Sequence, residues 1–321
     1  MNTLSRILST LLLLTLCTVA VAKEAMTAFV PLAEPELLVG DKFERSEGIA
    51  FNGEGRLFVT ANRALWEITT DYDVHKVADL HSNLGLAPIG ERDLLVADFG
   101  PTNAFEHDRN ADGVVWRITP EGEKTIISEG VIGDPNFIVM RKDGALLVSD
   151  DATADIWIIE KNEDGDYEKP KIFSTAVNHP NGLVLTEDEN TLYVAQIFNT
   201  IRPLIRDDRL WKIDLRDGKA VSDATLVTRT GPRAANDGLA MDRLGRIYIA
   251  ANFLAGEVWR YDPKSKRVDL IAGGMYGSAS IAFGEGEFDH QSIYVTTTFN
   301  GGRGGNIWRV PVGIEGAKLN R

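Results

Sequence analysis

Four residues with oxygen-bearing side chains occupy one repeated position of this sequence, and together they could bind a metal ion. The position lies about ten residues before an apolar segment that recurs six times along the chain. Two of the four side chains are carboxylates and two are carboxamides. From the first repeat to the last, the position holds Glu47, Leu84, Asn136, Asn181, Asp237 and Ala279.

This set of residue types favours a hard divalent cation. Oxygen ligands without His or Cys select Ca²⁺ ahead of Mg²⁺ or Mn²⁺, with Zn²⁺ a further alternative. Two carboxylates match the charge of a divalent ion, and without one they would repel each other across a narrow space. A simpler interpretation stays open, because Asn or Asp before Gly is also a common turn former.

The repeat that positions these residues is marked by tryptophan. Each tryptophan follows an apolar residue and is followed, two positions later, by another. This alternation is typical of a strand with one buried face. The six pairs are Leu65–Trp66, Val115–Trp116, Ile156–Trp157, Leu210–Trp211, Val258–Trp259 and Ile307–Trp308.

Each repeat has room for four short strands joined by turns such as Asn52-Gly53. Six units of four strands predict an all-β fold, a six-bladed β-propeller. After Trp308 too little chain remains for a fourth strand, whereas 36–39 offers a spare one. We therefore expect this N-terminal strand to close the ring and remove an open sheet edge. The repeat predicts a single domain over residues 23–321.

Residues 1–22 read as a secretion signal, with Arg6 before an apolar run and Ala20-Val21-Ala22 at the cleavage site. The run is shorter than the roughly 20 apolar residues of a membrane span. We therefore expect a secreted or periplasmic protein with no membrane partner after signal removal. The net charge of −13 argues against nucleic acid.

The motifs around the repeated position resemble a known family. Ser46-Glu47-Gly48, Pro135-Asn136, Pro180-Asn181-Gly182 and Asn236-Asp237-Gly238 are similar to the four metal-site motifs of the senescence marker protein/gluconolactonase (regucalcin-like) family, which is related to diisopropyl fluorophosphatase. The resemblance implies a six-bladed, calcium-dependent hydrolase of lactones or, in some members, organophosphates. It also implies Glu47, Asn136, Asn181 and Asp237 as ligands. Phe137 departs from the pattern, because sugar-lactone members often carry Asp there.

The leading functional hypothesis is a metal-dependent hydrolase of a lactone or related ester. The metal would polarise the carbonyl group of the substrate and stabilise the oxyanion. Asp237 would be both a ligand and the general base that activates water. Asp98 and Asp150, at the ends of second strands, are reserve candidates for the base.

Aromatic residues are expected to line the entrance to this site. A phenylalanine follows the second strand in four repeats, at Phe99, Phe198, Phe253 and Phe299. Such residues would form an apolar vestibule for a small-molecule substrate, or else merely cap the ends of the blades. Asn199 lies on one of the long loops and would offer a polar contact. With Phe137, these residues predict a preference for hydrophobic lactones over gluconolactone.

Other functional classes remain open at this stage. The same fold could be a non-catalytic propeller that binds a ligand or protein and carries a structural calcium ion. It could also be a strictosidine-synthase-like enzyme, which would require a carboxylate at the mouth of the central channel but not the full ring of ligands. A quinone-dependent sugar dehydrogenase would want a basic residue and a histidine near the channel, and no such pair is evident.

Overall fold

A computed structural model describes residues 31–101, 111–298 and 305–321. Residues Pro31–Arg321 form one compact unit. Within the described ranges the regular secondary structure consists of β-strands, without a helix. No described segment forms a helix long and apolar enough to cross a membrane. The predicted signal at 1–22 and the predicted domain boundary at residue 23 fall outside the described residues.

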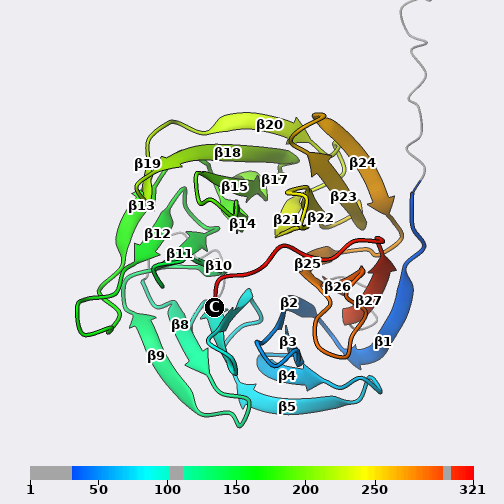
Figure 1. The fold of residues 1–321 in the computed structure, drawn as a ribbon, viewed down its shortest axis with the longest axis horizontal. Helices are drawn as coiled ribbons and strands as arrows, with labels where there is room; N and C mark the ends of the chain where they lie inside the picture. The colour runs from blue at the N-terminus through cyan, green and yellow to red at the C-terminus, as the bar shows by residue number, and fades with distance from the viewer. Residues whose placement is uncertain (1–30, 102–110, 299–304) are drawn as a thin grey trace, which may run out of the picture. The chain divides into compact units, whose positions relative to one another are not determined.

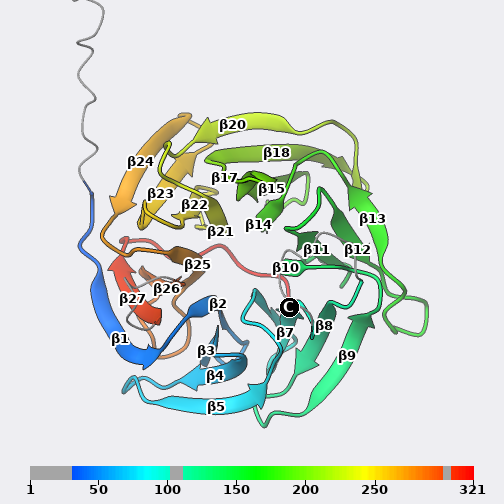
Figure 2. The same ribbon diagram turned by 180° about the vertical axis from the view of Figure 1, so that it is seen from behind.

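Six antiparallel sheets are arranged in a ring, as the six-bladed propeller prediction requires (Figure 1, Figure 2). The first strand of each sheet lies next to the axis of the ring, and neighbouring first strands contact one another. The six innermost strands are β2 (Ser46–Phe51), β6 (Leu86–Ile89), β10 (Pro135–Met140), β14 (Pro180–Leu185), β21 (Asn236–Met241) and β25 (Ser278–Phe283).

The remaining strands of each blade follow outward in order. The second strands are β3 (Leu57–Ala61), β7 (Asp93–Asp98), β11 (Leu146–Asp150), β15 (Thr191–Gln196), β22 (Ile247–Ala251) and β26 (Ser292–Thr297). The third strands are β4 (Ala64–Ile68), β8 (Val114–Ile118), β12 (Ile156–Ile159), β18 (Arg209–Arg216), β23 (Glu257–Asp262) and β27 (Gly305–Pro311). The outer strands are β5 (Val74–Asp79), β9 (Lys124–Glu129), β13 (Lys171–Ser174), β20 (Thr225–Arg229), β24 (Arg267–Ala272) and β1 (Glu36–Phe43).

The tryptophan repeat fixes the register between second and third strands. In every blade the tryptophan pairs with a Val or Ile of the second strand, so equivalent side chains lie at equivalent places. The pairs are Val59–Trp66, Val96–Trp116, Val148–Trp157, Val194–Trp211, Ile249–Trp259 and Val295–Trp308.

The N-terminal strand closes the ring, which confirms the expected closure. β1 pairs antiparallel with β27, with Leu37 opposite Trp308 and Val39 opposite Ile307. It thus supplies the outer strand of the sixth blade, whose other three strands come from the C-terminal part of the chain. Val39 and Phe43 are buried in a core that they share with the first blade.

Side-chain caps on the turns between first and second strands hold the blades at one end. The carboxamide oxygen of Asn52 accepts hydrogen bonds from the backbone N–H groups of Glu54 and Arg56, at 3.1 and 3.0 Å. The carboxylate of Asp242 accepts from Leu244 and Arg246 in the same way. These are Asx turns, which explain the polar residue at the end of each of these first strands.

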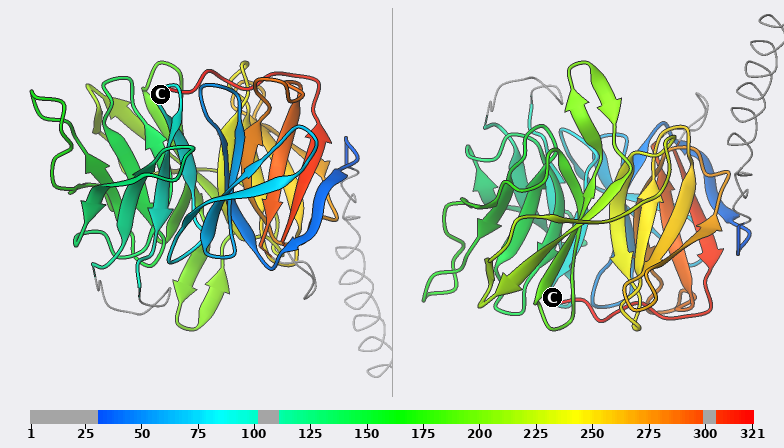
Figure 3. Two further views of the ribbon diagram at one scale, coloured as in Figure 1. Left: turned by 90° about the horizontal axis from the view of Figure 1, so that it is seen from below. Right: turned by 90° about the horizontal axis from the view of Figure 1, so that it is seen from above.

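The two faces of the ring differ: a hairpin projects from one, and the C-terminal segment crosses the other. After β15 the chain forms a projecting hairpin, β16 (Phe198–Ile201) and β17 (Leu204–Arg206), where the sequence predicted only a long loop. A short strand, β19 (Lys219–Ala220), pairs antiparallel with the end of β18. Figure 3 shows the hairpin on one face and the C-terminal segment across the other. We call the hairpin side the mouth face.

Candidate metal centre

The repeated position lies at the start of the innermost strands. Glu47, Asn136, Asn181 and Asp237 are each the second residue of their strand, at the mouth face. In these four blades the pairing register shifts at this point; between Asn236 and Leu239, for example, the strand bulges. A bulge re-aims a side chain that would otherwise alternate across the sheet. The same irregularity in four blades therefore presents the four side chains in equivalent ways.

Close packing between neighbouring first strands explains the glycines that follow three of these residues. A Cβ atom on Gly48 would lie 2.1 Å from the carbonyl oxygen of Leu84 in the next blade. One on Gly182 would lie 2.2 Å from the carbonyl oxygen of Asp237. Glycine is used where two backbones approach this closely. The Glu-Gly, Asn-Gly and Asp-Gly pairs thus reflect the geometry of the ring as well as its chemistry.

Hydroxyl groups of the second strands complete the bulge. The Thr60 hydroxyl accepts from the Gly48 N–H at 2.8 Å and donates to the Leu84 carbonyl of the next blade at 2.7 Å. Thr296 does the same in the sixth blade, accepting from the Ser280 N–H and donating to the Glu47 carbonyl. Each of these hydroxyls therefore couples the candidate position of one blade to that of its neighbour.

Asn181 is the clearest sign of a ligand at this position. Its side chain is 1% exposed, and neither its oxygen nor its nitrogen has a hydrogen-bond partner among the described residues. Leaving a buried polar group unsatisfied costs about 1–3 kcal/mol. A carboxamide in this state fits a site where a further group, such as a cation, accounts for its oxygen.

Asp237 is a buried carboxylate with an unusual protonation equilibrium. It is 2% exposed, and burial raises its pKa from 3.8 to about 7. The opposing influences are a hydrogen bond from the Asn252 amide, 2.5 Å from Asp237 Oδ2, and one from the Gly238 backbone. The Asn252 oxygen accepts in turn from the Thr298 hydroxyl at 3.2 Å. Asp237 is therefore held in place and titrates near neutral pH.

Glu47 belongs to the same electrostatic cluster although its side chain is only partly buried. Burial raises the pKa of Glu47 well above its ordinary value, and the carboxylates of Asp237 and Asp151 raise it further. Like charges this close disfavour ionisation of both groups. A divalent cation between them would reverse that effect, which is the electrostatic argument for a metal here.

Asp151 and Asn252 are site residues that the sequence analysis did not identify. Asp151, 2% exposed, accepts a hydrogen bond from the Asn136 amide at 2.8 Å. Both residues follow the end of a second strand, at the same face as the candidate ligands. The usable signal was the polar residue directly after the second strand in several blades, as at Asn62 and Thr298.

Asp98, a reserve candidate for the base, is saturated by hydrogen-bond donors. Its buried carboxylate accepts from the backbone N–H groups of His81, Ser82 and Gly100. It also accepts from the Ser82 hydroxyl and, at 3.3 Å, from the Trp116 indole. A carboxylate with this many donors holds the surrounding loops together, and we assign it no chemistry.

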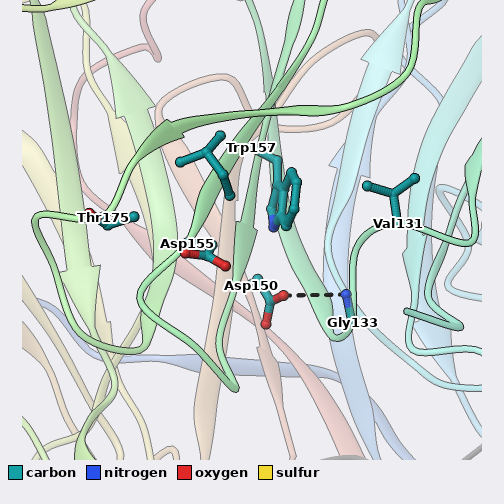
Figure 4. A pocket seen from close by; sticks show the side chains of 7 residues that line it. Val131, Gly133, Asp150, Asp155, Trp157 and Thr175 are labelled. Atoms are coloured by element: carbon teal, nitrogen blue, oxygen red, sulfur yellow. Dashed lines mark hydrogen bonds between the residues drawn. The ribbon is translucent and has the colours of Figure 1, made fainter. Parts of the chain in front are cut away.

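Asp150, the other reserve candidate, faces a pocket beside the third blade (Figure 4). The pocket has a volume of about 340 Å³ and is lined in part by Trp157, Ile172 and Asp155. Asp150 accepts from the Gly133 N–H at 3.3 Å, and burial raises its pKa. It is the neighbouring Asp151 that interacts with Glu47 and Asp237.

The predicted entrance residues fall into different environments. Phe198 and Phe253 contact each other edge to face, with ring centroids 6.0 Å apart, and Phe253 is partly exposed. Phe99 is buried among core residues of the second and third blades. Asn199 lies at the start of the hairpin and accepts from Arg209 at 3.2 Å. Phe299 lies outside the described residues.

Phe137 does not face the entrance. It is 8% exposed and packs in the core between the third and fourth blades, near Leu147 and Leu183. Its apolar character therefore serves packing. Exposed apolar residues at the mouth face come instead from the hairpin and from nearby loops: Leu204, Ile205, Leu254 and Tyr276.

The residues present fit an oxygen-ligated cation. Between residues 31 and 321, the described segments contain no group of three His, Cys, Asp or Glu side chains that could hold a metal ion. A cation at the mouth would therefore depend on the carboxamide oxygens of Asn136 and Asn181 as well as on Glu47 and Asp237. Mixed carboxylate and amide oxygen sets suit Ca²⁺.

Fold and site together define a six-bladed propeller with an acidic, amide-containing mouth. Residues 164–299 match the model of the SMP-30/gluconolactonase/LRE-like region, which confirms the resemblance to that family. No curated protein gives a match.

Solved structures of low sequence identity share the fold. A gluconolactonase from Xanthomonas campestris is 20% identical, with a TM-score of 0.66, and 90% of this chain aligns with 93% of that one. The calcium-binding protein regucalcin from Agrobacterium tumefaciens is 19% identical, with a TM-score of 0.65 over 91% of this chain and 99% of that one. A PQQ-bound aldose sugar dehydrogenase from Streptomyces coelicolor also aligns, at 12% identity and a TM-score of 0.61, over 88% and 99% of the two chains. The fold therefore carries more than one chemistry, and function must be argued from the site.

Proposed function

We propose that the protein is a divalent-cation-dependent hydrolase of lactones or related esters. The observation that carries the proposal is the buried, unpartnered carboxamide of Asn181 in register with Glu47, Asn136 and Asp237. The family match over residues 164–299 and the gluconolactonase among the similar structures support the substrate class.

Glu47, Asn136, Asn181 and Asp237 would hold the cation, with Ca²⁺ the first candidate. When bound, it would polarise the substrate carbonyl and stabilise the negative charge that develops on its oxygen. The chain's own contribution is to fix the ligands in a closely packed ring. The similarity to a calcium-binding regucalcin supports the choice of ion.

Asp237 would serve as the general base. Beside the cation its carboxylate would be ionised, and an ionised carboxylate can accept a proton from the attacking water. The water oxygen then bonds to the carbonyl carbon, the ring C–O bond breaks, and the proton passes to the leaving oxygen to give a hydroxy acid. Asn252 keeps the Asp237 carboxylate oriented through Oδ2.

The substrate would be more hydrophobic than a sugar lactone. Phe253, Leu254 and Tyr276 expose apolar surface at the mouth face. The hairpin, with Leu204 and Ile205, is tied to this region by hydrogen bonds from Arg206 to the Arg233 carbonyl and from Arg233 to the Leu254 carbonyl. Burying an alkyl substituent here would contribute roughly 25 cal/mol per Å².

Hydrolysis of an alkyl-substituted lactone and of gluconolactone, each corrected for spontaneous hydrolysis, tests the proposal. We expect kcat/KM to favour the alkyl lactone by about tenfold, or ~1.4 kcal/mol. A chelator should abolish activity and added Ca²⁺ restore it. Asp237→Asn should be inactive, whereas Asp242→Asn, which alters a buried carboxylate in the turn after the same strand, should keep its activity. Absence of lactone and aryl-ester hydrolysis with every divalent cation tried would refute the activity.

We also infer that the protein acts after export, in the periplasm or outside the cell. The charged and apolar segments within residues 1–22 support this location. Fractionation of cells that express the full chain, with N-terminal sequencing of the exported form, tests the inference. A cytoplasmic protein that retains Met1 would contradict it.

A further inference from the structure

Asp151 lies beside the candidate ligands without belonging to their repeated position. It follows β11, and its backbone N–H donates to the Asp134 carbonyl at 3.3 Å. The side chain is 2% exposed. The negative charge of Asp151 raises the pKa of Glu47, and the negative charge of Asp237 raises the pKa of Asp151. Asp151 is thus a third carboxylate at the mouth.

One oxygen of the Asp151 carboxylate determines the orientation of the Asn136 carboxamide. The Asn136 Nδ2 atom donates to Asp151 Oδ2 at 2.8 Å. The carboxamide therefore presents its nitrogen, and not its oxygen, to Asp151. Its oxygen then points away from Asp151. Only the oxygen can bind a cation, so this orientation decides whether Asn136 is a ligand.

The other oxygen of Asp151 has no assigned role within the fold. Asp151 Oδ1 is buried and has no hydrogen-bond partner among the described residues. Asn181, in the next blade, is in the same state. Both groups, in adjacent blades, are therefore available to interact with a further charged or polar group.

We propose that Asp151 is a positioning residue for the cation, which fixes the Asn136 oxygen toward it and adds a third negative charge to Glu47 and Asp237. The inference rests on the metal site of the proposed function and not on the reaction catalysed. Partners of metal ligands typically contribute 10–100-fold to metal affinity. The third charge should favour ions of higher charge, because the Coulomb attraction scales with the charge of the ion.

Two substitutions separate orientation from charge. Asp151→Asn removes the charge and keeps an oxygen that can accept from Asn136, whereas Asp151→Ala removes both. Asp242→Asn is the matched control, because Asp242 is a buried carboxylate paired with Arg246 in the turn that follows the other end of β21. Metal-free protein would be titrated with Ca²⁺ by calorimetry and with Tb³⁺ by luminescence, and its melting temperature would be measured without metal.

We expect Asp151→Asn to weaken Ca²⁺ binding about tenfold and Tb³⁺ binding more, and Asp151→Ala to weaken Ca²⁺ binding about 100-fold. Asp242→Asn should lower the melting temperature and leave both affinities unchanged. Wild-type Ca²⁺ affinity in Asp151→Ala would overturn the proposal. Equal losses of Ca²⁺ affinity in Asp151→Asn and Asp151→Ala would overturn the orientation role. A wild-type protein that binds Ca²⁺ without hydrolysing lactones would refute only the enzymatic proposal. A wild-type protein that binds no cation would refute both.

Discussion

The surroundings of the polar side chains separate a metal site from a set of turn caps. A capping Asn or Asp accepts from a backbone N–H two residues ahead, as Asn52 and Asp242 do at the other end of the blades. Asn136 instead donates to Asp151, and Asn181 has no hydrogen bond from either side-chain atom. The turn-former interpretation therefore does not account for these two residues.

Glu47→Gln tests the cation at the residue scale. The change removes one of two predicted carboxylate ligands while keeping the size of the side chain, so we expect Ca²⁺ affinity to fall at least about tenfold, ~1.4 kcal/mol. Metal content and lactone hydrolysis should fall together, and the β-rich circular dichroism spectrum should stay unchanged. Glu67→Gln, which breaks an ion pair with Arg56 on the first blade, is the control. Elemental analysis that finds no metal in folded, unchelated wild-type protein would contradict the prediction.

The raised pKa of Asp237 makes the stability of the metal-free protein depend on pH. The folded state holds its proton up to about pH 7, whereas the unfolded chain releases it near 3.8. Between these values the folded state binds more protons, so the free energy of unfolding should rise as pH falls from about 7 toward 4. Denaturant unfolding of chelated protein across this range measures the effect.

Asp237→Asn should reduce this pH dependence, because the group that takes up the proton is gone. The remaining slope would report Glu47 and Asp151, whose pKa values are also raised. If wild type and variant show the same slope between pH 4 and 7, Asp237 does not titrate there.

At the scale of elements, the sequence predicted the blades well because their signal is local. Alternation around each tryptophan is a property of one strand. In the structure, the tryptophan in the third strand of each blade pairs with a Val or Ile of the second strand. The closing strand was predictable as well, because the sixth repeat lacked one. Asp151 could not be placed, because its contact with Asn136 depends on where β11 ends relative to the bulge in β10.

The hairpin β16–β17 is a second feature that the sequence pattern did not predict. Phe198–Arg206 lacks a regular alternation of apolar and polar residues, and its exposed Leu204 and Ile205 have no core to indicate them. Tertiary hydrogen bonds through Arg206 and Arg233 place it. Local patterns carry no information about such contacts.

Removing β1 tests ring closure. A chain that begins at Phe43 loses the pairing of residues 36–39 with β27 and the buried Val39. We expect the free energy of unfolding to fall by several kcal/mol, since a strand with core contacts is lost from a marginally stable fold. A chain that begins at Pro35 and keeps β1 is the control. Melting of the two within a degree or two of each other would show that closure is unimportant.

For the molecule as a whole, the two faces of the ring have different tasks. The C-terminal segment crosses the face opposite the mouth (Figure 3). There the Ala317 N–H donates to the Met241 carbonyl and the Asn320 amide donates to that of Met140, at the far ends of β21 and β10. Arg321 forms an ion pair with Glu285 beyond β25. This segment thus links three blades on the side away from the candidate site.

Deleting residues 315–321 should therefore affect stability and not the site. Loss of several hydrogen bonds, each worth about 1 kcal/mol net, should lower the free energy of unfolding by roughly 1–3 kcal/mol. Ca²⁺ affinity and lactone hydrolysis should stay within twofold of wild type when measured well below the melting temperature. A large loss of Ca²⁺ affinity would show that the tail also shapes the mouth.

Because β1 pairs with β27, the ring can close only after nearly the whole chain has been synthesised. The ribosome makes β1 among the first strands and β27 last, so the partner of Glu36 and Val39 does not exist until nearly the whole chain has emerged. At ordinary elongation rates this interval is on the order of tens of seconds. Throughout it, both hydrogen-bonding edges of a nascent ring stay open to other chains. The protein should thus depend on chaperones until β27 has paired with β1, and its yield should fall when synthesis outpaces their supply.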